Sequence, residues 1–388
     1  MSATPKTRVN GSKTPKLLDF SAEDLMRRLT ERRAFEAVIW GMPAVNFDLL
    51  YRAMVSAKGG WNQIVYWSRL PDWKNQTLTP NPDVIYVFPF FDTKDVGPMV
   101  MEIPPAEGGS ITGSIDDAWQ SALEDVGPAG ADKGKGGKYL ILPPGYQDKV
   151  PEGYIVLPCD TYRSYAILRS NLASGSETDI AAAVSYGKRV RIYPLSQAAN
   201  PSPTKFIDAI DIVYDSTIPY DVRFFEALDR FVQHEPWLTR DKVMIDMLKS
   251  IGIEKGKQFN PDAALQNVLE DGAAEAHAWL DAGYEAAFSP PYFSGSHWAL
   301  PASKEVLEGM PTFFPTPMPI RSKAAASSTP WLISAPSIWA RGNFICWRLT
   351  IEAAAHSTAR ARIVSRCPST HRSISTGQLR SMTGRPMR

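Results

Sequence analysis

The sequence has little of what would assign it to a functional class. Its 388 residues include only three cysteines, Cys159, Cys346 and Cys367, and they form no C-x-x-C pair, which argues against a disulfide framework or a zinc knuckle. No stretch approaches the roughly 20 apolar residues that a membrane-spanning helix needs. The N-terminus is basic and polar and lacks the apolar core of a signal peptide. We therefore expect no membrane span and, for the chain as written, a cytoplasmic location.

Motifs for catalysis and cofactor binding are also missing. The five histidines form no H-E-x-x-H or H-x-H pattern, and no serine stands in a G-x-S-x-G turn. The sequence accordingly predicts neither a metal site nor a nicotinamide, flavin or haem cofactor.

One glycine-rich stretch, GPAGADKGKGGKYLILPPGY at residues 127–146, invites comparison with a phosphate-binding loop. Counted from Gly130, however, the sixth position is Lys135 where a P-loop needs glycine, and no serine or threonine follows a lysine here. The stretch leads into the apolar run YLIL, a predicted strand, whereas phosphate loops lead into a helix N-terminus. We predict that it only turns the chain.

What is present indicates an α+β fold. The 32 prolines and runs such as VIYVFPFF and YRSYAILRS favour a mainly antiparallel β-sandwich, with helical spacing before and after it. We divide the chain into a disordered leader (1–20), N-terminal helices (21–60), a β-sandwich domain (61–200), a helical segment (201–290), the start of a C-terminal β domain (291–320) and a tail (321–388).

Capping and breaking residues define the expected helices. Ser21 should cap a first helix that runs to about Ile39, and Pro43 should break it and open a second helix that ends near Ser56. Three more helices are predicted over the runs VRFFEALDRFVQ, RDKVMIDMLKSIG and NPDAALQNVLEDGAAEAHAWLDAGYEAAF, the last capped by Asn260.

Two polar stretches could carry chemistry. The first, SIDDAWQSALEDVG, holds Asp116, Asp117, Trp119, Gln120 and Asp125. Paired carboxylates of this kind can share a proton or bind a polyol, although such acids also occur in ordinary polar loops.

The second stretch, LTPNPDVIYVFPFFDT, places Asn81 and Asp83 just before a strand that contains Tyr86. An Asn-x-Asp sequence is often only an Asx turn, but it could also present an amide and a carboxylate at the mouth of a sandwich. We predict that both stretches line one concavity.

Charge is distributed unevenly along the chain. Residues 321–388 carry ten arginines and Lys323 against one acidic residue, Glu352, so this stretch has a net charge of +10 and the rest of the chain −9. A basic tail on an acidic body could bind nucleic acid. The resemblance described next favours another explanation, and we predict no nucleic-acid partner.

Long segments resemble bacterial proteins that pair domains of unknown function 1254 and 1214. The resemblance is carried by WGMPAVNFDLLYRAM, TPNPDVIYVFPFFD, IDDAWQSALEDVGPAGADKGKGGKYLILPPGY and DVRFFEALDRFVQHEP, and it spans about residues 30–320. It implies a β-sandwich, a helical middle segment and a C-terminal jelly-roll-like domain, incomplete here. Relatives are often exported, and no activity accompanies the resemblance.

The tail departs from that resemblance. Back-translated with suitable codons, residues 342–388 encode in another reading frame a segment that contains YRLAVP followed by YWSATVYD, a pattern that the resemblance implies near the end of the chain. We therefore predict that residues 321–388 are a disordered, out-of-frame product.

Two functions remain open. The chain is either a binding protein for a small polar or carbohydrate-like ligand, or a hydrolase or lyase for such a substrate. In the second case Asp83, Asp116 and Asp117 would supply acid and base groups. In both cases Asn81, Tyr86, Trp119, Gln120 and Asp125 would contact the ligand. Assembly into a homo-oligomer is left open.

Overall fold

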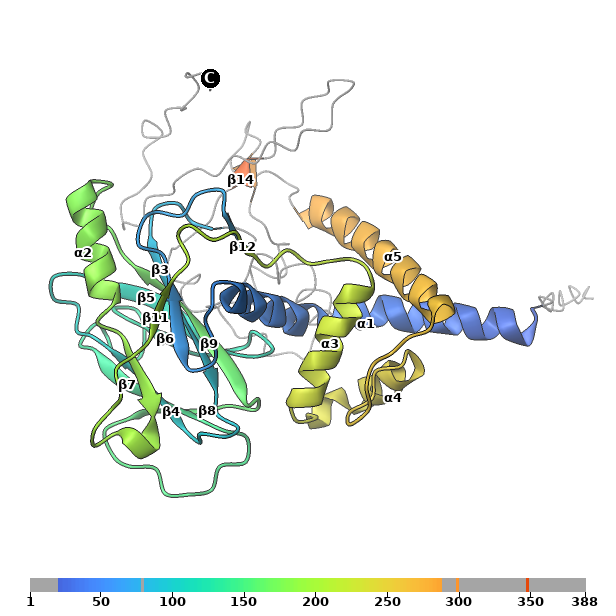
Figure 1. Ribbon diagram of the computed structural model, residues 1–388, viewed down its shortest axis with the longest axis horizontal. Helices are drawn as coiled ribbons and strands as arrows, with labels where there is room; N and C mark the ends of the chain where they lie inside the picture. Colours follow the sequence, from blue (N-terminus) through green and yellow to red (C-terminus); the bar gives the residue numbers. More distant parts are fainter. Residues whose placement is uncertain (1–19, 78–79, 288–297, 300–346, 349–388) are drawn as a thin grey trace, which may run out of the picture.

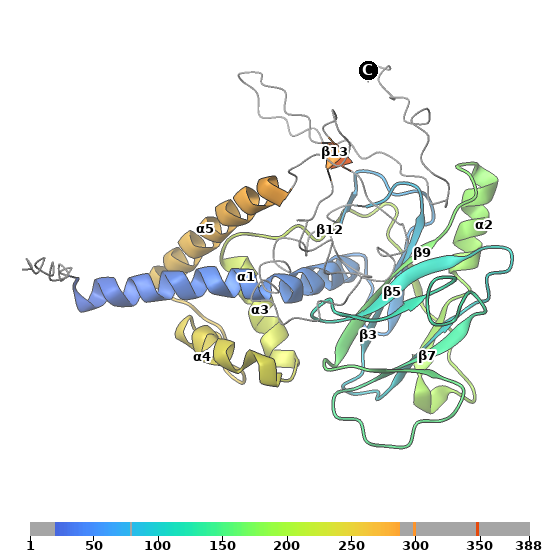
Figure 2. The same ribbon diagram turned by 180° about the vertical axis from the view of Figure 1, so that it is seen from behind.

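A computed structural model of the protein describes residues 20–77, 80–287, 298–299 and 347–348. The architecture is α+β, as predicted, with a sandwich of strands and a group of helices (Figures 1 and 2). The predictions about the leader, the C-terminal β domain and the tail lie outside the described residues. The exceptions are the two-residue strands β13 (Trp298–Ala299) and β14 (Trp347–Arg348), which pair with each other.

The sandwich consists of two sheets. The larger has the strand order β11-β1-β3-β9-β5-β6 and the smaller the order β10-β4-β7-β8. Most neighbours are antiparallel, but β1 pairs with β11, and β7 with β8, in parallel. The strands of the larger sheet are β1 (Gln63–Tyr66), β3 (Ile85–Asp92), β5 (Ile111–Asp117), β6 (Ala122–Val126), β9 (Arg163–Ser170) and β11 (Phe206–Asp208). Those of the smaller are β4 (Met99–Ile103), β7 (Gly137–Leu142), β8 (Ile155–Pro158) and β10 (Arg191–Pro194). A short pair, β2 (Asn75–Gln76) and β12 (Tyr214–Asp215), lies beside them.

Both faces of the larger sheet are buried. One face packs against the smaller sheet through residues such as Val87, Met101 and Ile115. The other packs against the second half of helix α1 (Ala22–Ser56), where Phe47 meets Tyr165. Because strand β3 is covered on both sides, it reads as a continuous apolar run rather than an alternating one.

Helix α1 corrects one prediction. Ser21 caps it as expected, its hydroxyl accepting a hydrogen bond from the Asp24 N–H at 3.0 Å. The predicted break at Pro43 is wrong, since α1 continues through it to Ser56. An interior proline costs about 3 kcal/mol. This cost is offset because residues on either side, such as Val38 and Phe47, are buried in two different cores.

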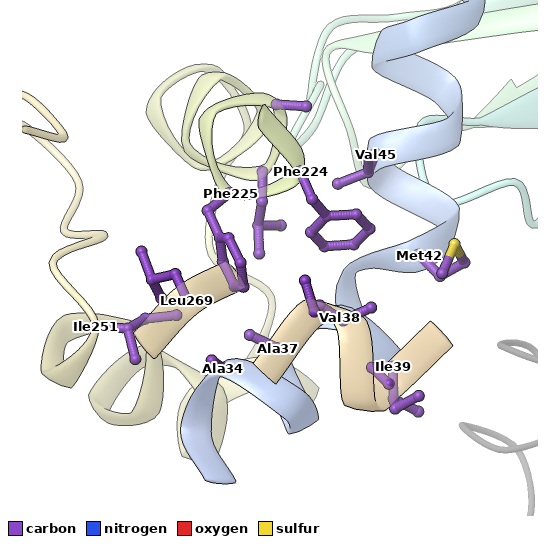
Figure 3. Close-up of a cluster of buried hydrophobic side chains, with 14 of the residues drawn as sticks. Ala34, Ala37, Val38, Ile39, Met42, Val45, Phe224, Phe225, Ile251 and Leu269 are labelled. Carbon is purple, nitrogen blue, oxygen red and sulfur yellow. The ribbon is translucent and has the colours of Figure 1, made fainter. Parts of the chain in front are cut away.

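The first half of α1 belongs to a group of helices. It packs against α3 (Val222–His234), α4 (Lys242–Ser250) and α5 (Ala263–Ala287), all three predicted, with Phe224, Phe225 and Leu269 in the shared core (Figure 3). The predicted cap of the last helix is wrong: α5 begins at Ala263, and Asp262 accepts the Leu265 N–H at 2.8 Å.

Three further elements complete the described part of the chain. Helix α2 (Glu177–Gly187), which the sequence analysis missed, lies at the end of the sandwich far from the helical group (Figures 1 and 2). Two short 3-10 turns cover Leu195–Gln197 and Thr239–Asp241. No helix in the described residues is long and apolar enough to cross a lipid bilayer.

Candidate functional site

The two predicted polar stretches do not form one concavity. Strands β3 and β5 are both antiparallel to β9, so they run in the same direction, and Ile85 and Ile111 both pair with Ser170. The Asn81 stretch precedes the start of β3, whereas Asp117 ends β5. The two stretches therefore lie at opposite ends of the strands.

The Asn81 stretch is an Asx turn, one of the two predicted alternatives. The Asp83 N–H donates to Asn81 Oδ1 at 2.9 Å, and the Asn81 N–H donates to the Tyr86 hydroxyl at 2.8 Å. The turn thereby fixes the buried Tyr86 ring at the start of β3.

Asp117 organises the tip of the β5–β6 hairpin. Its Oδ1 accepts the N–H groups of Trp119 and Ser121, each at 2.8 Å. Burial raises the pKa of Asp117 to about 6, although these hydrogen bonds and the Arg240 charge oppose the shift. The contacts of this carboxylate are thus those of a turn.

The hairpin tip joins the sandwich to the helices. Gln120, in the left-handed backbone region at φ +60°, donates from Nε2 to the Pro43 carbonyl at 2.7 Å and to Asn46 Oδ1 at 2.9 Å. The Trp119 ring packs edge-on against Trp40 of α1 and Phe231 of α3, with centroids 4.7 and 4.8 Å apart. Gln120 and Trp119, which were predicted to contact a ligand, therefore contact other parts of the chain.

Asp116 differs from its neighbour. It is fully buried, and neither carboxylate oxygen has a hydrogen-bond partner among the described residues. It pairs across the sheet with Tyr165, another fully buried side chain whose hydroxyl is also unpartnered within the described part of the chain. Burial, together with the charges of Asp117 and Asp125, raises the pKa of Asp116 well above its usual range, against the opposing charge of Arg169. Asp116 therefore keeps its proton at pH values where an exposed aspartate loses it.

Further polar side chains share this face of the sheet. Ser114 pairs with Asp125 on β6 and donates a 2.5 Å hydrogen bond to its Oδ1. Arg169, further along β9 on the same side as Tyr165, places its guanidinium 5.6 Å from the centre of the Tyr86 ring. We call Tyr86, Ser114, Asp116, Asp125, Tyr165 and Arg169 the polar stripe.

Sequence reasoning found only half of the polar stripe. Tyr86, Asp116 and Asp125 were predicted, whereas Ser114, Tyr165 and Arg169 were missed. The period of two along YRSYAILRS places Tyr165 and Arg169 on one strand face and would have revealed them.

The glycine-rich loop turns the chain into β7, as predicted. Its centre is occupied by Asp132, whose Oδ1 accepts the Gly127 N–H at 2.6 Å and the Tyr139 hydroxyl at 2.9 Å. Gly130 has no room for a side chain, because a Cβ there would lie 2.3 Å from the Asp125 carbonyl oxygen. The carboxylate of Asp132 thus takes the position that a bound anion would need.

A second buried acidic group lies where α3 meets the sandwich. Glu235 accepts the N–H groups of Tyr162 and Arg163 at 2.6 and 3.2 Å, and burial raises its pKa to about 7. Beside it, Asp92 lies 3.1 Å from both His234 Nε2 and Arg163 Nε. These contacts connect the end of α3 with the sandwich.

The other possible sites are weak. Among the described residues, no group of three or more histidine, cysteine or acidic side chains could hold a metal ion. A surface pocket of about 460 Å³ lies between α1 and α4, and one of about 370 Å³ between α1 and α5. Neither is lined by a residue of the polar stripe or by any predicted site residue.

Comparison with known proteins gives a family match for the sandwich. Residues 61–194, from just before β1 to the end of β10, match the model of a family described as a protein of unknown function, DUF1254. The match covers every strand of the sandwich except β11 and includes all residues of the polar stripe. No curated protein matches the chain.

A solved structure shares the fold. The crystal structure of the VPA0106 protein from Vibrio parahaemolyticus aligns with a TM-score of 0.51 at 17% sequence identity. The alignment covers 76% of this chain and 66% of that chain, just under two thirds of the latter. This likeness supports the architecture; a function has to be argued from the side chains.

Proposed function

We propose that the polar stripe binds a small polar ligand of the polyol or carbohydrate kind. The observation that carries this proposal is the pair formed by Asp116 and Tyr165. Both are fully buried, and their polar atoms lack hydrogen-bond partners among the described residues.

Unpartnered buried groups of this kind are uncommon. More than about nine in ten buried polar groups in native proteins have a partner, and leaving one without costs about 1–3 kcal/mol. The other buried acids follow that rule, since Asp117, Asp132 and Glu235 each accept backbone N–H groups. Asp116 is the exception, so a ligand hydroxyl is a fitting partner for it.

The donor and acceptor set suits hydroxyl groups. A protonated Asp116 offers one O–H donor and remaining acceptor sites, and Tyr165 offers a second hydroxyl. The aromatic ring of Tyr86 supplies an apolar surface against which a carbon chain can pack. Exposure increases along β9 from the fully buried Tyr165 to the half-buried Arg169, so we expect the ligand to enter at the Arg169 end.

Two tyrosine variants test the proposal. Tyr165→Phe removes only the unpartnered hydroxyl, and Tyr214→Phe is a matched control because Tyr214 is equally buried but donates to the Leu50 carbonyl at 2.7 Å. A panel of polyols and sugars is screened by thermal shift, and hits are measured by calorimetry. We expect Tyr165→Phe to weaken binding about tenfold, the equivalent of about 1.4 kcal/mol. Equal binding by both variants, or no ligand at all in the panel, would overturn the proposal.

Catalysis at the same residues is the second candidate. Asp116 and Asp125 lie on one face of the sheet in different surroundings, which suits a general acid and a general base. The buried Asp116, whose pKa is raised, would be the acid. A hydrolase or lyase would convert the bound ligand, which NMR of the incubated mixture detects. If the ligand stays unchanged, catalysis is excluded and only the binding function remains.

We also propose four features that the sequence predicts: a cytoplasmic location, no nucleic-acid partner, pairing with a domain of unknown function 1214, and a frameshifted tail. Whether the chain forms a homo-oligomer is left open. Resequencing of the gene tests the frameshift, and sedimentation of the purified chain tests the assembly state.

A further inference from the structure

Arg169 is an arginine without an ionic partner. Within the described residues, its guanidinium makes a cation–π contact with Tyr86 but no hydrogen bond or ion pair. Other arginines of the sandwich do have partners: Arg163 contacts Asp92 at 3.1 Å, and Arg191 contacts Glu102 at 3.2 Å. A half-buried guanidinium whose donors have no hydrogen-bond partner among the described residues is suited to a planar, two-oxygen anion.

The acids near Arg169 do not neutralise it by direct contact. The charge of Arg169 acts on Asp116, but burial favours the protonated form of that carboxyl group, and Asp125 accepts a hydrogen bond from Ser114. The positive charge at the entrance of the polar stripe is therefore available to a ligand.

Spacing along β9 relates the charge to the unpartnered pair. Arg169 and Tyr165 stand four residues apart on the same face, about 13 Å at the backbone. The charge of Arg169 acts on Asp116, the cross-strand partner of Tyr165, so a molecule with an extended carbon chain can contact both ends of the polar stripe.

We infer that Arg169 pairs with the carboxylate of the ligand, so that the polar stripe takes a small hydroxy acid whose hydroxyl groups reach Asp116 and Tyr165. This inference rests on the proposed function and narrows it to an anionic class of ligand. The carboxylate of the ligand then lies at the half-buried end of the polar stripe, beside Arg169. Its hydroxyl groups lie at the fully buried end, beside Asp116 and Tyr165.

The test uses one matched set of probes: gluconate, glucitol and glucamine. These compounds share a six-carbon chain long enough to reach both ends of the polar stripe, and the acid of the first becomes a neutral alcohol in the second and an amine in the third. Binding is measured by calorimetry at constant ionic strength to wild type, to Arg169→Met and to Arg189→Met. The last is the control, because Arg189 makes the same kind of contact with Tyr186, with its guanidinium 4.9 Å from the ring, away from the polar stripe.

We expect wild type and Arg189→Met to prefer the acid over the neutral alcohol at least tenfold, as a charged hydrogen-bonded pair provides. Arg169→Met should abolish that preference. Equal binding of the neutral alcohol, with Tyr165→Phe still weakening it, would overturn this inference and leave the proposed function intact. A preference for the amine, or no binding by any of the three probes, would also overturn the inference.

Discussion

Replacing Asp116 with asparagine should change how the stability of the protein depends on pH. The folded-state pKa of Asp116 is raised, so between the unfolded-state pKa of about 3.9 and the folded-state value the native protein holds a proton that the unfolded chain releases. The free energy of unfolding therefore falls as the pH rises through this window. The amide that replaces the carboxyl group in the Asp116→Asn variant cannot titrate, and it resembles the protonated acid in its donors and acceptors.

The expected magnitude follows from proton linkage. The stability of the variant relative to wild type should grow by about 1.4 kcal/mol for each pH unit above pH 5, until Asp116 ionises in the folded state. Urea unfolding followed by tryptophan fluorescence at half-unit steps from pH 4.5 measures this difference.

A control substitution on the neighbouring residue separates this effect from loss of contacts. For Asp117→Asn the growth should stop near pH 6, the folded-state pKa of Asp117, after about 2 kcal/mol counted from pH 4.5. The asparagine oxygen can still accept the Trp119 and Ser121 N–H groups, and the weaker neutral contacts add an offset. If the Asp116→Asn and wild-type curves run parallel between pH 5 and 6, Asp116 is ionised in the folded protein and our account of the polar stripe is wrong.

Three further predictions concern the structural residues. Asp132→Ala should cost about 3 kcal/mol because it leaves buried donors of the glycine-rich loop unpaired, whereas Lys135→Ala on the exposed part of the same loop should stay within about 0.5 kcal/mol. Adding ATP should not change the melting temperature of wild type or of either variant, and an ATP-dependent rise in wild type that is lost in Lys135→Ala would contradict the turn assignment. Trp119→Ala should destabilise the protein by about 3 kcal/mol, because its ring packs against both α1 and α3. The control Trp73→Ala, at an exposed position, should have a negligible effect, and equal melting temperatures of the two variants would refute the role of Trp119 in joining the sandwich to the helices. Glu235→Gln should gain about 1.4 kcal/mol of stability relative to wild type for each pH unit between pH 5 and 7, because the carboxyl group whose folded-state pKa is about 7 can no longer titrate; a difference that stays constant over this range would count against it.

Local chemistry was enough to predict much of the fold. The proline-punctuated apolar runs indicated the sandwich, and amphipathic spacing indicated α3, α4 and α5. Helix α2 was missed although its signal is present, since Ser176 accepts the Asp179 N–H at 3.2 Å in a capping pattern. Pro43 was misread because its local cost is outweighed by tertiary packing, which a local pattern does not contain.

The candidate site was harder to predict for the same reason. Asp116 and Asp117 are adjacent in sequence, yet successive strand residues point to opposite faces, so one lies in the polar stripe and the other caps a hairpin. Trp119 and Gln120 looked like ligand contacts because polar and aromatic groups in a loop can serve either purpose. Only the position of α1 decides that they bind the chain itself.

The continuous helix α1 also sets an order of events during synthesis. Its second half finds its partners once the sandwich strands up to β11 have emerged, but its first half packs against α3 and α5, which end at His234 and Ala287. Synthesis adds about 5–20 residues per second, so several seconds pass between the emergence of β11 and the end of α5. During this time the face of α1 around Ala37 and Val38 lacks its packing partners. A nascent chain that stalls before α3 would thus hold a finished sandwich with half a helix exposed, the kind of apolar surface that chaperones recognise.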